Sequence, residues 1–175
     1  DKEQLSFGID LVETGLKKIE MCDIRIVLGH HPIDWFIPTK QERIKNLFKD
    51  YGVIYLHGHL HITKTTIGQY INSNFLNIQA GAAFQASENK SNDKKNSLLW
   101  SEIDFEKRSI SLQPRYWDYN QRKWEFNQDY LESDRRRDGN QNWWEYELPV
   151  KKGEKKVTTN RSEIPVPKDW FTIEY

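Results

Sequence analysis

The sequence predicts an α/β fold that continues into a β-rich second sheet and ends in an extended C-terminal tail. Three observations favour this class. Helical and strand-like patterns alternate through residues 1–58, short β-rich segments follow up to about residue 130, and the remainder is charged and aromatic. We therefore divide the chain into a folded part, residues 1–131, and a tail, residues 132–175, that we expect to be partly ordered.

The first part is expected to form helix, strand, helix and strand in turn. Residues 3–20 place apolar side chains three and four apart, which predicts an amphipathic helix. Residues 24–29, "IRIVLG", are apolar and β-branched and predict a short buried strand. Thr39 is the predicted N-cap of a second helix that ends at Gly52, and residues 53–58, "VIYLHG", predict the next buried strand. This order predicts a βαβ unit with two parallel strands packed under helices.

The chain beyond residue 61 changes to short strand-like segments separated by turn residues. The segments are "TKTTIGQYI", "FLNIQAGAAF", "SLLWSEIDFE", "RSISLQPRYWDY" and "KWEFNQDY". Residues 86–96 are polar and predict a loop. Five aromatic residues could anchor the tail to the folded part: Trp143, Trp144, Trp170, Phe171 and Tyr175.

Composition restricts the classes of partner. The 26 basic and 26 acidic residues balance, so no global charge draws the chain to nucleic acid or to an acidic membrane. "RRR" at 135–137 beside "NWWEY" is compatible with a nucleic-acid contact, but the flanking acidic residues favour a solvated loop. With one cysteine, Cys22, no intrachain disulfide forms, which favours the cytoplasm. No apolar run has membrane-spanning length and no signal peptide is visible.

Histidines cluster after the two predicted parallel strands. His30 and His31 follow the first strand, and His57, His59 and His61 alternate at the end of the second. Ligands of open α/β sheets bind at this carboxyl edge, and neutral imidazole is the commonest side-chain metal ligand. A single histidine after a strand is most often an ordinary polar residue, but both groups together favour a metal site.

The histidines are expected to differ in role. We predict His30, His59 and His61 as metal ligands. His57 precedes the glycine inside the apolar run, so a buried supporting role is favoured over a ligand role. His31 is expected to lie behind the ligands or to face substrate, and not to bind metal directly. Trp35 either lines the substrate cleft or caps the sheet.

"GHHP" at 29–32, followed by a helix and "GHLH" at 58–61, resembles the last two motifs of the calcineurin-like metallophosphoesterases. The resemblance extends from Leu5 to Tyr130. It implies a β-sandwich flanked by helices, with two divalent ions of Mn, Fe or Zn about 3.5–4 Å apart. It also implies that His30 and His59 bind one ion and His61 the other, and that a metal-bridging hydroxide attacks the phosphorus of a phosphate ester.

Three earlier motifs of that family are missing: Asp-X-His, Gly-Asp-X-X-Asp and Gly-Asn-His-Asp/Glu. No catalytic residue can therefore be assigned, and three histidines cannot hold a catalytic metal pair because hard ions also need carboxylates. Together with the start at Asp1 instead of Met, this predicts the C-terminal portion of a longer phosphoesterase, inactive without its N-terminal half. The alternative is a non-catalytic protein-interaction module that reuses the fold. Phosphomonoesters, phosphodiesters, nucleotides and nucleic acids all remain open as substrates.

Overall fold

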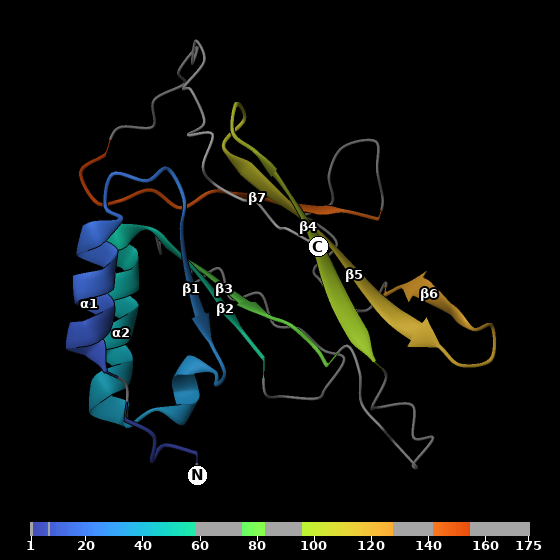
Figure 1. Cartoon of the computed structure of the whole chain (residues 1–175), viewed down its shortest axis with the longest axis horizontal. Helices are drawn as coiled ribbons and strands as arrows, with labels where there is room; N and C mark the ends of the chain where they lie inside the picture. Colours follow the sequence, from blue (N-terminus) through green and yellow to red (C-terminus); the bar gives the residue numbers. More distant parts are fainter. Residues whose placement is uncertain (1, 7, 59–74, 83–95, 128–141, 155–175) are drawn as a thin grey trace, which may run out of the picture.

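The computed structural model describes residues 2–6, 8–58, 75–82, 96–127 and 142–154. In these parts of the chain, two α-helices, a parallel sheet of three strands and an antiparallel sheet of four strands form a mixed α/β fold. The helices cover one face of the parallel sheet and the antiparallel sheet lies on the other side (Figure 1). The elements are α1 (Ile9–Lys18), β1 (Arg25–Gly29), the 3-10 helix η1 (Ile33–Trp35), α2 (Pro38–Tyr51), β2 (Val53–His57), β3 (Leu76–Gln79), β4 (Ser97–Asp104), β5 (Ser109–Asp118), β6 (Lys123–Phe126) and β7 (Trp144–Glu147).

The predicted βαβ unit is confirmed. β1 and β2 are parallel neighbours in register, from Arg25 opposite Val53 to Gly29 opposite His57. β3 extends the sheet on the far side of β2, also in parallel. The carboxyl ends of the three strands therefore meet at one edge of the sheet.

Both helices begin at residues other than those the sequence predicts. α1 starts at Ile9 after Gly8, and not at residue 3. Leu5 instead forms a parallel bridge with Phe36, and its amide donates to the Trp35 carbonyl at 3.4 Å. α2 starts at Pro38, so the prediction of Thr39 as N-cap is wrong. Proline is favoured in the first helical turn because it has no amide hydrogen to leave unpaired.

The predicted end of the second helix is confirmed at Gly52. This residue has a left-handed backbone conformation, with φ of 62°. A Cβ atom there would also lie 2.4 Å from the carbonyl carbon of Val150. Glycine is therefore required both by the turn and by the close approach of residues 148–154.

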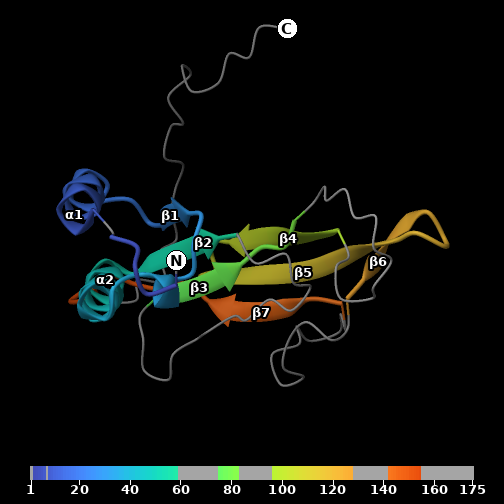
Figure 2. The same cartoon turned by 90° about the horizontal axis from the view of Figure 1, so that it is seen from below.

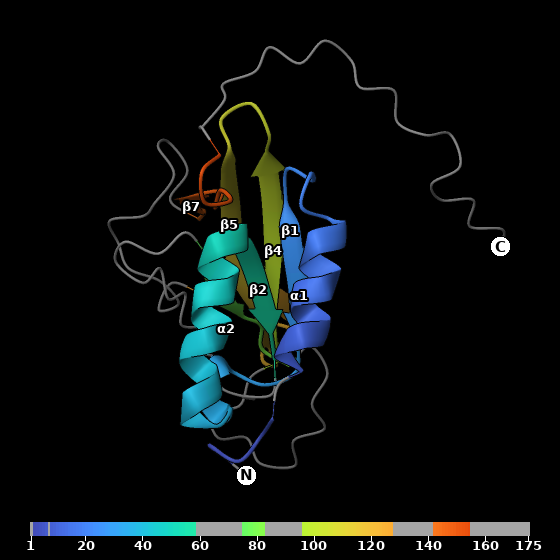
Figure 3. The same cartoon turned by 90° about the vertical axis from the view of Figure 1, so that its left-hand side faces the viewer.

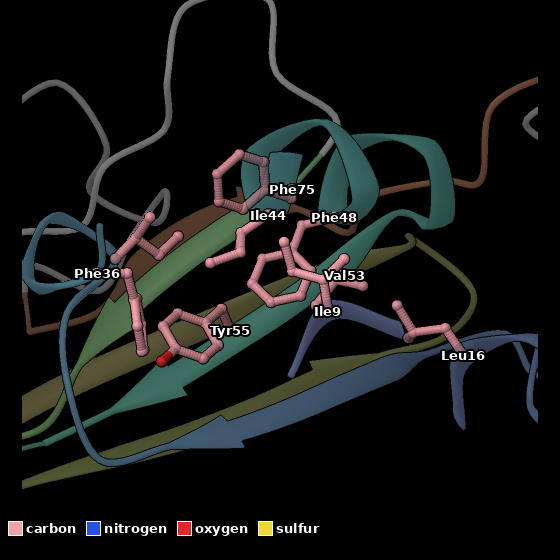
Figure 4. Close-up of a cluster of buried hydrophobic side chains, with 9 residues drawn as sticks. Ile9, Leu16, Phe36, Ile44, Phe48, Val53, Tyr55 and Phe75 are labelled. Carbon is pink, nitrogen blue, oxygen red and sulfur yellow. The ribbon is translucent and has the colours of Figure 1, made fainter. Parts of the chain in front are cut away.

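One hydrophobic core lies between the helices and the parallel sheet (Figure 4). Ile44 and Phe48 from α2 are fully buried there against Val53 and Tyr55 of β2. Ile9 and Leu16 bring the buried face of α1 into the same core. Burial of this apolar surface is the main source of stability for the helical layer.

A second core lies between the two sheets, and β7 contributes to it. Ile54 and Ile78 of the parallel sheet pack with Leu112 of β5 and with Trp144 of β7. β7 lies within residues 132–175, which the sequence predicts to be a partly ordered tail. It pairs antiparallel with β5, and Trp144 is fully buried.

The segment after β7 returns to the parallel sheet, where ion pairs hold it in place. Arg25 of β1 is 1% exposed, and its guanidinium donates to Glu154 at 2.9 Å and to the Tyr51 carbonyl at 3.1 Å. Lys151 donates to Glu20 at 2.7 Å. These contacts join residues that lie far apart in the sequence.

Several predictions fall outside the described residues. They are the strand-like segment "TKTTIGQYI", most of the loop at 86–96, the basic group at 135–137 and the anchors Trp170, Phe171 and Tyr175. Among the helices that the structure does describe, none has both the length and the apolarity needed to cross a lipid bilayer.

Candidate metal centre

The candidate site lies at the carboxyl edge of the parallel sheet. β1 ends at Gly29, directly opposite His57 at the end of β2. His30 follows β1 and Gly58 follows β2, so the two histidine-bearing segments leave the sheet side by side. Of the three predicted metal ligands, the structure places His30. His59 and His61 lie outside the described residues.

His31 and Trp35, the predicted substrate-facing residues, stack on one another just after His30 in the chain. Pro32 ends the extended chain and η1 turns it back, which lets Trp35 stack on His31 with ring centroids 5.5 Å apart. The His31 ring meets the His30 ring edge-on at 4.6 Å. Both His31 and Trp35 are half-buried, while the next residue, Phe36, is buried in the helix-side core. Trp35 therefore stacks on the residue that follows the predicted ligand His30, and Phe36 is the residue of "DWF" that packs into the core.

Tyr55 fixes the backbone of the histidine pair, a role that the sequence does not predict. Its hydroxyl donates to the His31 carbonyl at 2.7 Å. The ring packs on Phe48 at 5.2 Å, which holds it firmly in the core (Figure 4). Burial raises the pKa of Tyr55 to about 12, so the hydroxyl remains a donor at neutral pH.

Gly29 is needed because Tyr55 crosses directly beneath it. A Cβ atom at residue 29 would lie 2.1 Å from the Tyr55 hydroxyl oxygen and 2.6 Å from the ring carbon that carries it. Real Cβ atoms do not approach other atoms this closely, and the buried ring has little freedom to move. The glycine that opens the first histidine motif thus has a packing reason in this chain.

His57 is buried, as predicted, and lies on the same face of β2 as Tyr55. It is 4% exposed, and its ring stacks on Tyr55 with centroids 5.4 Å apart. Burial lowers the pKa of His57, and the Gly58 carbonyl and Asp34 act in the opposite direction. The imidazole is therefore neutral at neutral pH, the form that supports or binds a metal.

Among the described residues, one carboxylate lies close to the histidine pair in the sequence. Asp34 follows the histidine pair in η1, but its side chain is 60% exposed and pairs with Lys2 at 3.5 Å. In the described residues, no three His, Cys, Asp or Glu side chains gather in a group that could hold a metal. Within this part of the chain the edge therefore presents the imidazoles of His30 and His57 and no cluster that includes a carboxylate.

Comparison with known proteins adds no relative. No family model, no curated protein and no solved structure matches this chain.

The signal that could have found Tyr55 was present in the sequence. Residues 55 and 57 alternate on one strand, so they share a face and Tyr55 must point toward the helices with His57. The contact with His31 depends on the path of η1, which no strand pattern predicts. The requirement for glycine at residue 29 follows from that contact.

Proposed function

We propose that this chain supplies the histidine side of a dinuclear metal site in a phosphate-ester hydrolase, with the carboxylate ligands contributed by polypeptide outside this sequence. The observation that carries the proposal is the register of β1 and β2. Because Gly29 lies opposite His57, "GHHP" and "GHLH" leave adjacent parallel strands at the same edge. Two histidine motifs at neighbouring strand ends are a geometry suited to metal binding.

In this proposal each residue of the edge has a distinct task. His30, His59 and His61 bind the ions, and the neutral, buried His57 supports the loop from behind. Tyr55 holds the His31 backbone through its hydroxyl at 2.7 Å, and this fixes the direction in which His30 leaves the strand. His31 and Trp35 form an aromatic wall beside the ligands that would contact the ester.

The metals would be Mn, Fe or Zn, which imidazole and carboxylate ligands together accommodate. When bound, such ions activate water and stabilise negative charge on phosphoryl oxygens. Within the described residues this edge offers imidazoles without carboxylates, so we expect the chain alone to bind metal without turning over phosphate esters. The single cysteine, Cys22, is exposed and unpaired, and we propose the cytoplasm as the setting.

Equilibrium dialysis against Zn²⁺ and Mn²⁺ tests this function. We expect the chain to bind metal, and His30→Ala, His59→Ala and His61→Ala each to weaken binding at least about tenfold. His31→Ala is the matched control, because His31 follows His30 directly but is not a proposed ligand. Equal binding by all four variants would contradict the proposal and favour the non-catalytic interaction module.

Hydrolysis of bis-p-nitrophenyl phosphate provides a second test. The chain alone is expected to show no metal-dependent hydrolysis. Activity that depends on added metal would contradict the claim that carboxylates from outside this sequence are needed.

A further inference from the structure

The outer face of the antiparallel sheet presents a tryptophan and an arginine side by side. Leu99 and Ile103 of β4 pack against the core between the two sheets. Trp100 therefore points to the opposite, outer face, and it is 56% exposed. On β5, Leu112 lies in that core, so Arg115 points outward by the same alternation.

Two further tryptophans extend this outer face into the β5–β6 hairpin. Trp117 lies two residues after Arg115 on β5 and therefore shares its face. The register places Trp124 of β6 directly opposite Trp117. The two rings meet edge-on with centroids 5.6 Å apart, and both side chains are half-buried. We call the surface formed by Trp100, Trp117 and Trp124 the tryptophan face.

The tryptophan face lies far from the helical layer. Figures 1 and 2 both show the β5–β6 hairpin at the end of the molecule farthest from α1 and α2. In Figure 3 the helices stand in front, and β4 and β5 lie behind the parallel sheet. A ligand on the outer face of the antiparallel sheet would therefore approach from the side opposite the helices.

Arg115 joins the tryptophans and keeps a charge that is not neutralised. Its guanidinium carbon lies 5.4 Å from the centroid of the Trp100 ring. Nε donates to the Gln113 side chain at 2.9 Å, and Nη1 donates to the Trp124 carbonyl at 3.5 Å. Both acceptors are neutral, and within the described residues Nη2 makes no hydrogen bond and no carboxylate pairs with this arginine. The guanidinium is thus held in place with donors left for an anion.

The acidic side chains of the hairpin lie on the other face of the sheet. Asp118 and Glu125 each follow a tryptophan in the sequence, so they point away from the tryptophan face. Asp118 accepts hydrogen bonds from the amides of the β5–β6 turn, and Glu125 pairs with Lys123 at 2.6 Å. On β4, the first acidic residue of the outer face is Glu102, which pairs near the start of β5, away from the hairpin. The charge beside the three tryptophans is therefore positive.

We propose that the tryptophan face binds single-stranded nucleic acid, with bases stacked on the tryptophan rings and a phosphate on Arg115. Bases stack on aromatic side chains whatever their sequence, and the phosphates that join them are anionic. A surface of flat rings with one immobilised guanidinium matches both parts of such a strand. A neutral oligosaccharide would use the rings and leave the charge of Arg115 without a partner.

Cross-strand packing alone does not account for this arrangement. Packing explains rings that their neighbours cover, whereas Trp100 is more than half exposed. The 26 basic and 26 acidic residues of the chain give no global attraction to nucleic acid, so the affinity must come from these local contacts. The binding needs no metal and does not depend on the proposed function.

Fluorescence anisotropy of a fluorescein-labelled oligothymidylate of about twelve nucleotides tests the proposal. The chain is titrated at low salt in EDTA, so that no metal takes part. We expect saturable binding that Trp100→Ala weakens at least about fivefold, because one stacked base is lost. Trp100→Phe keeps a ring and should retain most of the affinity. Phe105→Ala is the matched control and should bind as the wild type does, because Phe105 is 61% exposed in the β4–β5 turn, outside the tryptophan face.

The role of Arg115 is tested by the salt dependence of binding. For a single strand, each phosphate contact contributes about −0.7 to the slope of log affinity against log salt concentration. Arg115→Gln should weaken binding and make the slope about 0.7 less steep, whereas Arg115→Lys keeps the charge and should keep the slope. An unchanged slope in Arg115→Gln would overturn the assignment of a phosphate to this residue.

A duplex and a neutral sugar identify the class of ligand. A duplex of the same length hides its bases and should bind at least tenfold more weakly than the single strand. No binding of the single strand, equal binding of the duplex, or no effect of Trp100→Ala would overturn the proposal. Binding of cellohexaose in place of the oligonucleotide would overturn it as well and assign the tryptophan face to sugars. Because all titrations contain EDTA, failure here leaves the metal site standing, and failure of metal binding in dialysis leaves this surface standing.

Discussion

Gly29→Ala tests whether the histidine loop and the core are linked through Tyr55. The added methyl group would lie 2.1 Å from the Tyr55 hydroxyl oxygen, 2.6 Å from Cζ and 2.7 Å from Cε2. Tyr55 is 1% exposed and packs on Phe48 at 5.2 Å and on His57 at 5.4 Å, so the ring cannot move away freely. Overpacking of a close-packed core typically costs about 1 to 3 kcal/mol, and we expect a loss of unfolding free energy in that range.

Urea denaturation followed by circular dichroism measures this loss, and the chain offers a matched control. Gly15 lies inside α1 with no atom within 4 Å of an added Cβ, so Gly15→Ala should stabilise the chain by about 0.5 to 1 kcal/mol. In a Tyr55→Ala background the ring is gone, and Gly29→Ala should cost much less than in the wild type. A cost that is equal in both backgrounds would refute the steric link between Gly29 and Tyr55.

Three further predictions concern the contacts around the sheet. Tyr55→Phe removes the donor to the His31 carbonyl and is expected to cost about 1 kcal/mol of unfolding free energy in the same denaturation assay. Zinc binding in dialysis should also be weaker. If neither value changes, this hydrogen bond does not position the histidine loop. The pKa of Tyr55 rises from 10.0 to about 12 on folding, so between these pH values the folded state keeps a proton that the unfolded state loses. The contribution of this group to the unfolding free energy should be fully present below pH 10 and should fall by about 2 to 3 kcal/mol toward pH 12. Tyr55→Phe should flatten that part of the stability–pH profile. Glu154→Gln leaves the buried Arg25 guanidinium without its carboxylate, and amide exchange near Lys152 should become faster. We expect a loss of about 1 to 2 kcal/mol of unfolding free energy, a moderate cost because Glu154 is 43% exposed and solvent screens the pair. The control Lys152→Ala removes an exposed ion pair with Asp50 and should change the unfolding free energy by less than about 0.5 kcal/mol.

The parallel part of the fold could be predicted because each of its elements has a recognisable pattern in its own residues. Apolar β-branched runs at 24–29 and 53–58 flank a helical pattern that ends in glycine, and each of these signals depends on neighbouring residues alone. The start of α1 could not be predicted in the same way. Leu5 fits the helical spacing, but its pairing with Phe36 is a tertiary contact that overrides the pattern.

The candidate site likewise combines features that the sequence predicts with features that it does not. The positions of His30 and His57 follow from strand alternation and from the carboxyl-edge rule, and the structure places His57 in the core as expected. The role of Tyr55 depends on η1 folding back over the sheet, and the exposure of Ile26 and Leu28 depends on which strands are neighbours. Sequence periodicity carries information about one element at a time, whereas these features belong to pairs of elements that meet only after folding.

The central claim is that His30, His59 and His61 bind metal together at the edge of the parallel sheet. Zinc titration of the ¹⁵N-histidine-labelled chain, followed by NMR of the imidazole nitrogens, tests it most directly, since the chain has 5 histidines that single His→Gln variants assign. The account predicts that the nitrogens of His30, His59 and His61 show coordination shifts along one binding curve, while His57 shows none. A coordination shift confined to His59 and His61, with His30 unchanged at saturating zinc, would contradict it.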